Sequence, residues 1–169
     1  MAELIIDTNV PLVAKGISDM PQTCVSRCVE LLDEILSNKH IVVIDDKYLL
    51  IEEYEHKMNQ LSEINYANRF LKWLLTNQSN PSRVKQVSIT PTGHYEFEEF
   101  PQSLKDVQFD NSDRKFVAVA IANNNQAPIV QASDSKWIGW EAALNLEGIG
   151  IIFLCKHELT RVYERKQKR

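Results

Sequence analysis

Short runs of apolar residues, rich in β-branched side chains, recur along the chain between longer segments of mixed polarity. They occupy residues 4–6, 41–44, 128–132 and 151–155. A continuous run of this length is typical of a strand that is buried on both faces of a parallel sheet. We therefore predict four buried strands, the first of which stops abruptly at Asp7.

Longer segments place apolar residues three or four positions apart, which is the spacing of one helix face. They are residues 24–36, 47–58, 66–76, 113–124 and 134–146, with a more polar segment at 156–166. Strands that alternate with helices predict an α/β fold with three layers, α/β/α, around a mostly parallel central sheet of Rossmann-like topology. The length of 169 residues suits a single domain over residues 1–169.

Two stretches fit neither pattern. Residues 10–21 contain Gly16 and two prolines, which predicts a loop with at most a short helical turn. Residues 79–107 are interrupted by several prolines, and we predict an irregular insertion over the sheet edge, in which residues 84–89 could form a strand. A long connection of this kind is either a functional loop or a plain surface excursion.

The charge balance gives no sign of a nucleic-acid-binding protein, because the net charge is −4 and such proteins usually carry a basic excess. Residues 156–169 are nevertheless strongly basic. They predict a C-terminal helix that ends either as a solvated tail or as an arm that follows phosphates.

The start of the chain lacks a basic segment followed by an apolar stretch, and no apolar run approaches ~18 residues. We therefore predict a cytoplasmic protein without a membrane span. Cys24 and Cys28 lie one helical turn apart among apolar residues. They predict small buried side chains in a reducing compartment, whereas a zinc site is only weakly indicated because no Cys or His stands near them in sequence.

Four acids share one structural position, near the end of a strand or on the helix that follows one. They are Asp7, Glu53, Asp113 and Asp134. Each alone has an ordinary explanation as a turn former, a helix cap or a solvated residue. Together in one crevice they would repel by about 4 kcal/mol per close pair, so protonation or a divalent cation must compensate. Carboxylate ligands without Cys or His favour Mg²⁺ or Mn²⁺.

The surroundings of the first two acids form short motifs. Asp7-Thr8-Asn9 closes the first predicted strand with an Asp-x-Asn pattern. Glu53 lies on the edge of the apolar stripe of its helix, whereas Glu52 points to the opposite side. Glu53 is therefore the better candidate for a partly buried acid.

The other two acids extend the pattern. Asp113 heads an alanine-rich helix at residues 113–120, and Asp134 lies directly after a strand, within residues 132–137. With the first two motifs, this ordered set resembles the PIN-domain ribonucleases over residues 4–154. The resemblance implies a Mg²⁺- or Mn²⁺-dependent endonuclease that cuts RNA, often as the toxin of a toxin–antitoxin pair and often as a homodimer.

The resemblance also implies roles for individual residues. Three acids would hold the metal, and Glu53 would be a fourth ligand or orient the attacking water; the three are Asp7, Asp113 and Asp134. Asn9 and Ser133 would support the acids beside them. Arg114, Lys115 and Lys136 would either contact phosphates or be ordinary charges on a helix surface.

The sequence departs from the family at two places. Many members carry Thr where Ala132 stands and a further acid where Lys136 stands. These differences put a second metal in doubt and leave two alternatives open. One is a catalytically weak PIN-like module that binds RNA or a protein, and the other is a nuclease directed at DNA.

Overall fold

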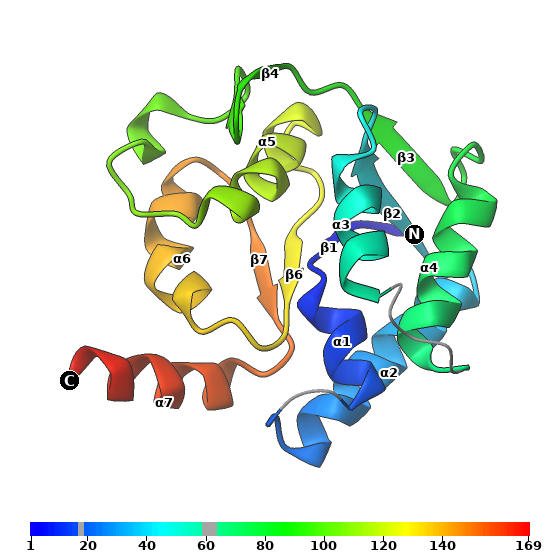
Figure 1. Cartoon of the computed structure of the whole chain (residues 1–169), viewed down its shortest axis with the longest axis horizontal. Helices are drawn as coiled ribbons and strands as arrows, with labels where there is room; N and C mark the ends of the chain where they lie inside the picture. The colour runs from blue at the N-terminus through cyan, green and yellow to red at the C-terminus, as the bar shows by residue number, and fades with distance from the viewer. Residues whose placement is uncertain (17–18, 59–63) are drawn as a thin grey trace.

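The computed structural model describes residues 1–16, 19–58 and 64–169. Its centre is a five-stranded sheet in the order β3-β2-β1-β6-β7, in which every neighbouring pair is parallel (Figure 1). The strands are β1 (Ala2–Ile6), β2 (His40–Asp45), β3 (Val84–Val87), β6 (Ile129–Gln131) and β7 (Ile151–Phe153).

Helices flank the sheet, so the predicted three-layer α/β/α fold is confirmed. The helices are α1 (Asn9–Lys15), α2 (Gln22–Leu36), α3 (Leu49–Met58), α4 (Tyr66–Asn77), α5 (Arg114–Ala122), α6 (Lys136–Leu146) and α7 (Lys156–Gln167). Figure 1 shows α1, α2 and α4 gathered to the right of β6 and β7, with α6 to their left. Among the described residues, no helix is both long and apolar enough to cross a bilayer.

The position of β1 decides where a ligand can bind. The chain runs outward from β1 through β2 to β3, and then returns to add β6 on the other side of β1. In open α/β sheets, the crevice at such a reversal, outside the carboxyl ends of the strands, is the usual ligand site. Asp7 and the loop that follows β6 both lie at this place in the topology.

The predicted loop at residues 10–21 is helical in its first part. α1 reaches Lys15 and buries Val10 and Val13 completely, whereas residues 17 and 18 lie outside the described residues. Pro11 does not prevent the helix because it lies in the first turn, where backbone N–H groups have no intrahelical partner. The helix ends at Gly16, whose φ of 88° is a left-handed conformation that suits glycine.

The segment 79–107 is more regular than predicted. β3 confirms the strand within residues 84–89 and pairs with β2 at the edge of the sheet. A small antiparallel hairpin follows, formed by β4 (Pro91–Gly93) and β5 (Glu96–Phe97). Two 3₁₀ turns, η1 (Gln102–Leu104) and η2 (Asn111–Asp113), then lead into α5.

The buried face of α6 is formed by Trp137, Trp140 and Leu144. Leu146 is 88% exposed. The helix carries apolar residues around most of its circumference, so their spacing alone does not decide which side packs inward.

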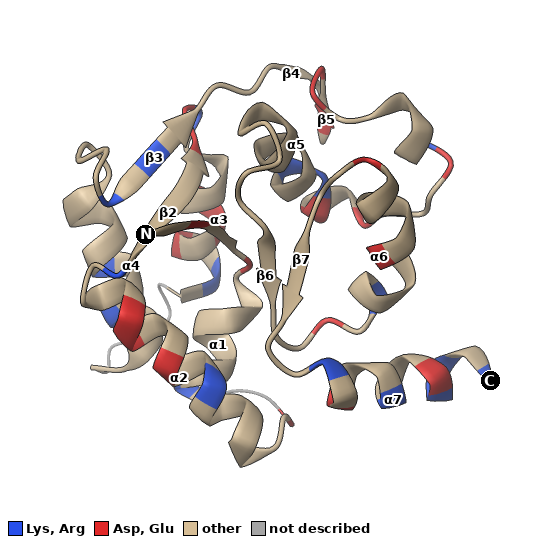
Figure 2. Ribbon diagram, turned by 180° about the vertical axis from the view of Figure 1, so that it is seen from behind, with Lys and Arg blue, Asp and Glu red and all other residues tan. Residues whose placement is uncertain are grey.

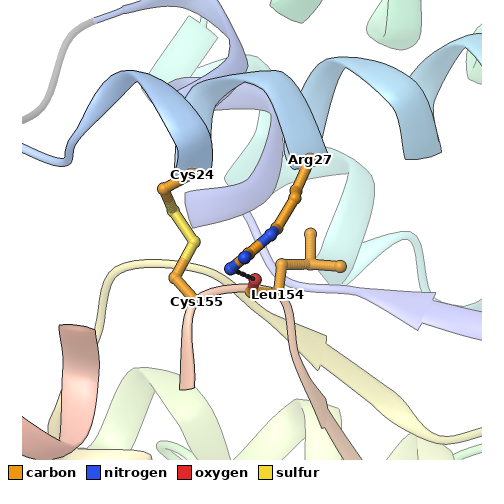
Figure 3. Close-up of a disulfide and its surroundings, with 4 residues drawn as sticks. All are labelled: Cys24, Arg27, Leu154 and Cys155. Atoms are coloured by element: carbon orange, nitrogen blue, oxygen red, sulfur yellow. Dashed lines mark hydrogen bonds between the residues drawn. A yellow bond between two sulfur atoms is a disulfide. The ribbon is translucent and has the colours of Figure 1, made fainter. Parts of the chain in front are cut away.

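Cys24 and Cys28 are fully buried, as predicted, and Cys155 is buried as well. A disulfide joins Cys24 of α2 to Cys155, which lies between β7 and α7, and Cys28 remains free (Figure 3). The prediction of a free thiol is wrong for Cys24, whose partner stands 131 positions away in the sequence. Only the folded topology brings them together.

Candidate functional site

Asp7 lies at the carboxyl end of the central strand and is only 2% exposed. Its Oδ1 accepts a hydrogen bond of 2.8 Å from the backbone N–H of Asn9. Burial, with a further contribution from the negative charge of Glu53, raises the pKa of Asp7 to about 6. The contact from Asn9 to Asp7 is made by its main chain, and its side chain donates instead to Gln131 at 3.4 Å.

Three other acids come together beside the start of α5 and α6. The carboxylate oxygens of Asp110, Asp113 and Asp134 lie within 4.8 Å of one another. Asp113 and Asp134 were predicted to meet, whereas Asp110 was missed. Asp110 lies in the turn before the helix, where an acid is common for helix-capping reasons, so nothing in its sequence context singles it out.

The acids act on one another electrostatically. Burial, followed by the charges of Asp7, Asp134, Asp110 and Glu53 in that order, raises the pKa of Asp113 to about 8. Of the four predicted acids, only Asp113 and Asp134 belong to the group within 4.8 Å, and Asp7 and Glu53 act on Asp113 from outside it. At neutral pH a proton or another positive charge is required on Asp113.

Glu53 lies near these acids but has cationic partners of its own. Its Oε1 accepts from Lys57 Nζ at 2.8 Å and from the Thr8 hydroxyl at 3.0 Å, while its Oε2 pairs with Lys115. Burial alone would raise the pKa of Glu53, but Lys115 and Lys57 hold it below its usual value. Sequence reasoning missed Lys57, although its position four residues after Glu53 on one helix was a usable signal.

The three basic residues predicted to contact phosphates have other partners in this structure. Lys115 pairs with Glu53, and Lys136 pairs with Asp110. The Arg114 guanidinium lies over the Phe100 ring, 5.4 Å from its centre. Two of the three cations therefore neutralise acids at the site.

Two hydrogen bonds hold the loop that carries Asp134 where it enters α6. Asp134 Oδ1 accepts the backbone N–H of Lys136 at 3.0 Å, which fixes the carboxylate at the start of α6. Ser133, predicted to support Asp134, is half-buried beside it. Ser135 is the better-connected hydroxyl, since it accepts from Lys166 of α7 at 3.1 Å.

A pocket of about 510 Å³ lies between α3, the β4–β5 hairpin and the residues around the start of α5. Glu53, Lys57 and Lys115 are among its lining residues. The rest of the lining is mainly aromatic, histidine and small side chains: Leu49, Glu52, His56, Pro91, Gly93, His94, Tyr95, Phe97 and Ser112. The segment 79–107, which the sequence left without a role, thus supplies one side of a pocket next to the acids.

The donor set fits a hard divalent cation. Three carboxylates can supply oxygen ligands from Asp110, Asp113 and Asp134, and this cluster includes no thiol or imidazole. Mg²⁺ and Mn²⁺ prefer such ligands. The raised pKa of Asp113 reflects the same crowding of negative charge that a divalent ion would relieve.

Comparison with known protein families, with curated proteins and with solved structures finds no match for this chain. The functional argument therefore depends on the geometry and chemistry of the site.

Proposed function

We propose that this protein is a metal-dependent endoribonuclease that hydrolyses RNA phosphodiester bonds. One observation carries the proposal: three carboxylates lie within 4.8 Å of one another beside a buried fourth, Asp7, at the carboxyl edge of the sheet. The ordered motifs that resemble the PIN-domain ribonucleases support it from the sequence side.

Asp110, Asp113 and Asp134 would hold the Mg²⁺ or Mn²⁺ ion, and the charge of the buried Asp7 would act on Asp113. When bound, such an ion supplies a water of lowered pKa and a counter-charge for a phosphate oxygen. Asn9 keeps the Asp7 carboxylate in place through its backbone N–H. The backbone N–H of Lys136 donates a hydrogen bond to Asp134 and so holds that carboxylate in the cluster.

Glu53 has a positioning role in this proposal. Its two oxygens fix the Lys57 and Lys115 ammonium groups on the wall of the pocket next to the acids. Cations held there would meet the backbone phosphates of a strand that reaches the carboxylates. Glu53 thereby places positive charge without being counted among the metal ligands.

A second candidate is a catalytically weak module that binds RNA or a protein. The ion pairs of Lys136 with Asp110 and of Lys115 with Glu53 favour it, because they compensate part of the acidic charge without a metal. A DNA-directed nuclease would use the same acids. The resemblance further suggests an antitoxin partner and a homodimeric state.

Cleavage of an end-labelled RNA by the purified protein tests the proposal. We expect cleavage with Mn²⁺ or Mg²⁺, none with EDTA, and none from Asp113→Asn. Asp106→Asn is the matched control, because Asp106 is exposed and lies outside the cluster. RNA binding without cleavage in any divalent ion would favour the binding module. A DNA strand of the same sequence, cut equally well, would favour the third candidate.

A further inference from the structure

The three cysteines form a compact group from two distant parts of the chain. Cys24 and Cys28 lie one turn apart on α2, and Cys155 lies between β7 and α7. Their sulfur atoms are all within 4.8 Å of one another, and each residue is 0% exposed. The Cys24 and Cys155 Cα atoms are 5.6 Å apart, inside the usual range for a disulfide.

The disulfide is a first tie between α2 and the end of β7. The second is a hydrogen bond of 3.0 Å from Arg27 Nη1 to the Leu154 carbonyl oxygen, which lies beside the disulfide (Figure 3). Both ties hold the point where β7 ends and α7 begins. No other covalent link between distant segments occurs in the described part of the chain.

α7 extends from this point and contacts α6, below which it lies in Figure 2. The Lys156 ammonium pairs with Glu141 at 2.8 Å. The Tyr163 ring lies so close to Gly139 that a Cβ atom there would come within 2.6 Å of the Tyr163 hydroxyl oxygen. Farther along, Lys166 donates to Ser135, the residue after Asp134. The disulfide thus anchors the helix that touches the Asp134 loop.

We propose that Cys24, Cys28 and Cys155 form a thiol–disulfide exchange site, in which Cys155 bonds alternately to Cys24 and Cys28 and which small thiols such as glutathione can reduce. In the exchange, Cys28 loses its proton and its thiolate attacks the Cys155 sulfur. The Cys24–Cys155 bond breaks as the Cys28–Cys155 bond forms, and the departing Cys24 thiolate takes up a proton. In the reduction, two glutathione thiols become glutathione disulfide and the protein gains two thiols.

Access to this buried site requires local opening, and the structure provides a weakly held segment for it. β7 is a three-residue edge strand that pairs only with β6. α7 buries only Leu159 among its twelve residues. Such edges open at lower free energy than the core. In the closed form, burial raises the pKa of the Cys28 thiol to about 12, which keeps it protonated and unreactive.

A structural zinc ion is the competing occupant of three clustered thiols. Such sites are almost always four-coordinate. No fourth His, Cys, Asp or Glu from the described residues joins the group within the same distance. The site is also fully buried, which leaves little room for water as the missing ligand. These observations favour disulfide chemistry.

Thiol trapping and mass spectrometry of the full chain test the proposal. In glutathione disulfide we expect a Cys24–Cys155 linkage in the wild type and a Cys28–Cys155 linkage in Cys24→Ser. The Cys28→Ser variant is the matched control and should keep the wild-type linkage. Circular dichroism confirms that each variant is folded. A folded Cys24→Ser protein that forms no Cys28–Cys155 bond would overturn the exchange.

A second measurement uses the wild type alone and does not depend on any variant. Native reduction by millimolar glutathione should raise amide hydrogen exchange at least tenfold in residues 151–167 and leave β2 unchanged. A bridge that resists reduction without denaturant would overturn the proposal, as would one zinc ion per chain that blocks the thiols. Neither measurement involves RNA, so their outcomes are independent of the nuclease proposal.

Discussion

The acidic cluster and the cysteine cluster differ in whether their side chains can stabilise one another. Each gathers three side chains of one kind from distant segments, at least one of them deeply buried. The cysteines need no other partner, since two of them share a covalent bond. The acids cannot stabilise one another, because ionised carboxylates repel one another and burial strengthens the repulsion. A cluster that is complete by itself indicates a structural or redox role, whereas a cluster whose charge is only partly compensated, here by Lys136 on Asp110, indicates a ligand.

The largest expected effect comes from removing one acid of the cluster. Asp113→Asn should lower RNA cleavage by about 10³-fold or more, because a metal that loses a ligand forfeits several kcal/mol of transition-state stabilisation. Steady-state cleavage rates measure this, with Asp106→Asn retaining the wild-type rate. Comparable cleavage by the two variants would remove the acids from the mechanism.

The cysteine cluster should contribute to stability and not to RNA cleavage. Cys155→Ser should lower the free energy of unfolding by about 2–5 kcal/mol, the usual cost of losing a native disulfide that closes a long loop. Urea unfolding of the oxidised wild type and the variant measures the difference. Adding a reductant should destabilise the wild type and leave Cys155→Ser unchanged. Equal stability of wild type and variant would mean that the bridge is not formed.

The pH dependence of stability should separate the two clusters further. The pKa values of Asp7 and Asp113 are raised to about 6 and about 8, so the metal-free native state holds protons that the unfolded state has released. The contribution of these groups is therefore favourable in acid and is lost as the pH rises from about 4 to 8. The Asp113→Asn variant lacks the carboxyl group whose pKa is raised more.

Unfolding of the wild type and of Asp113→Asn in EDTA, at several pH values, measures this effect. The stability of Asp113→Asn relative to the wild type should increase by a few kcal/mol between pH 5 and pH 9. Cys155→Ser is the control, since its difference from the wild type should vary little over this range. A pH-independent difference for Asp113→Asn would show that Asp113 is not crowded by negative charge.

The smallest effect is expected where the acidic region already has a cation. Lys115→Met leaves Glu53 with Lys57 and Thr8 only, and should cost about 1–2 kcal/mol of stability, because both partners in the lost pair are nearly buried. Thermal unfolding of Lys115→Met measures the loss of stability, and Lys39→Met at an exposed position is the control. No loss beyond the control would mean that Lys57 alone satisfies Glu53.

Local patterns in the sequence predicted most of the sheet and part of the site. Asp7 follows a continuous apolar run, and Asp113 opens the buried stripe of its helix, so each acid is visible from its neighbours. Asp110 lacks such a context. It directly precedes η2, and only the folded structure brings it close to Asp134. The disulfide depends on contacts between α2 and the far edge of the sheet, which no local pattern encodes.

The central claim is that the acidic cluster binds a divalent cation in place of protons. Calorimetric titration of the wild type with Mn²⁺ at pH 7, repeated in buffers of different ionisation enthalpy, tests it most directly. Because Asp113, with a pKa of about 8, is largely protonated at that pH, we predict saturable binding with release of about one proton, and weakened binding in Asp113→Asn. Absence of saturable binding in the wild type, or binding that the variant retains in full, would contradict the account.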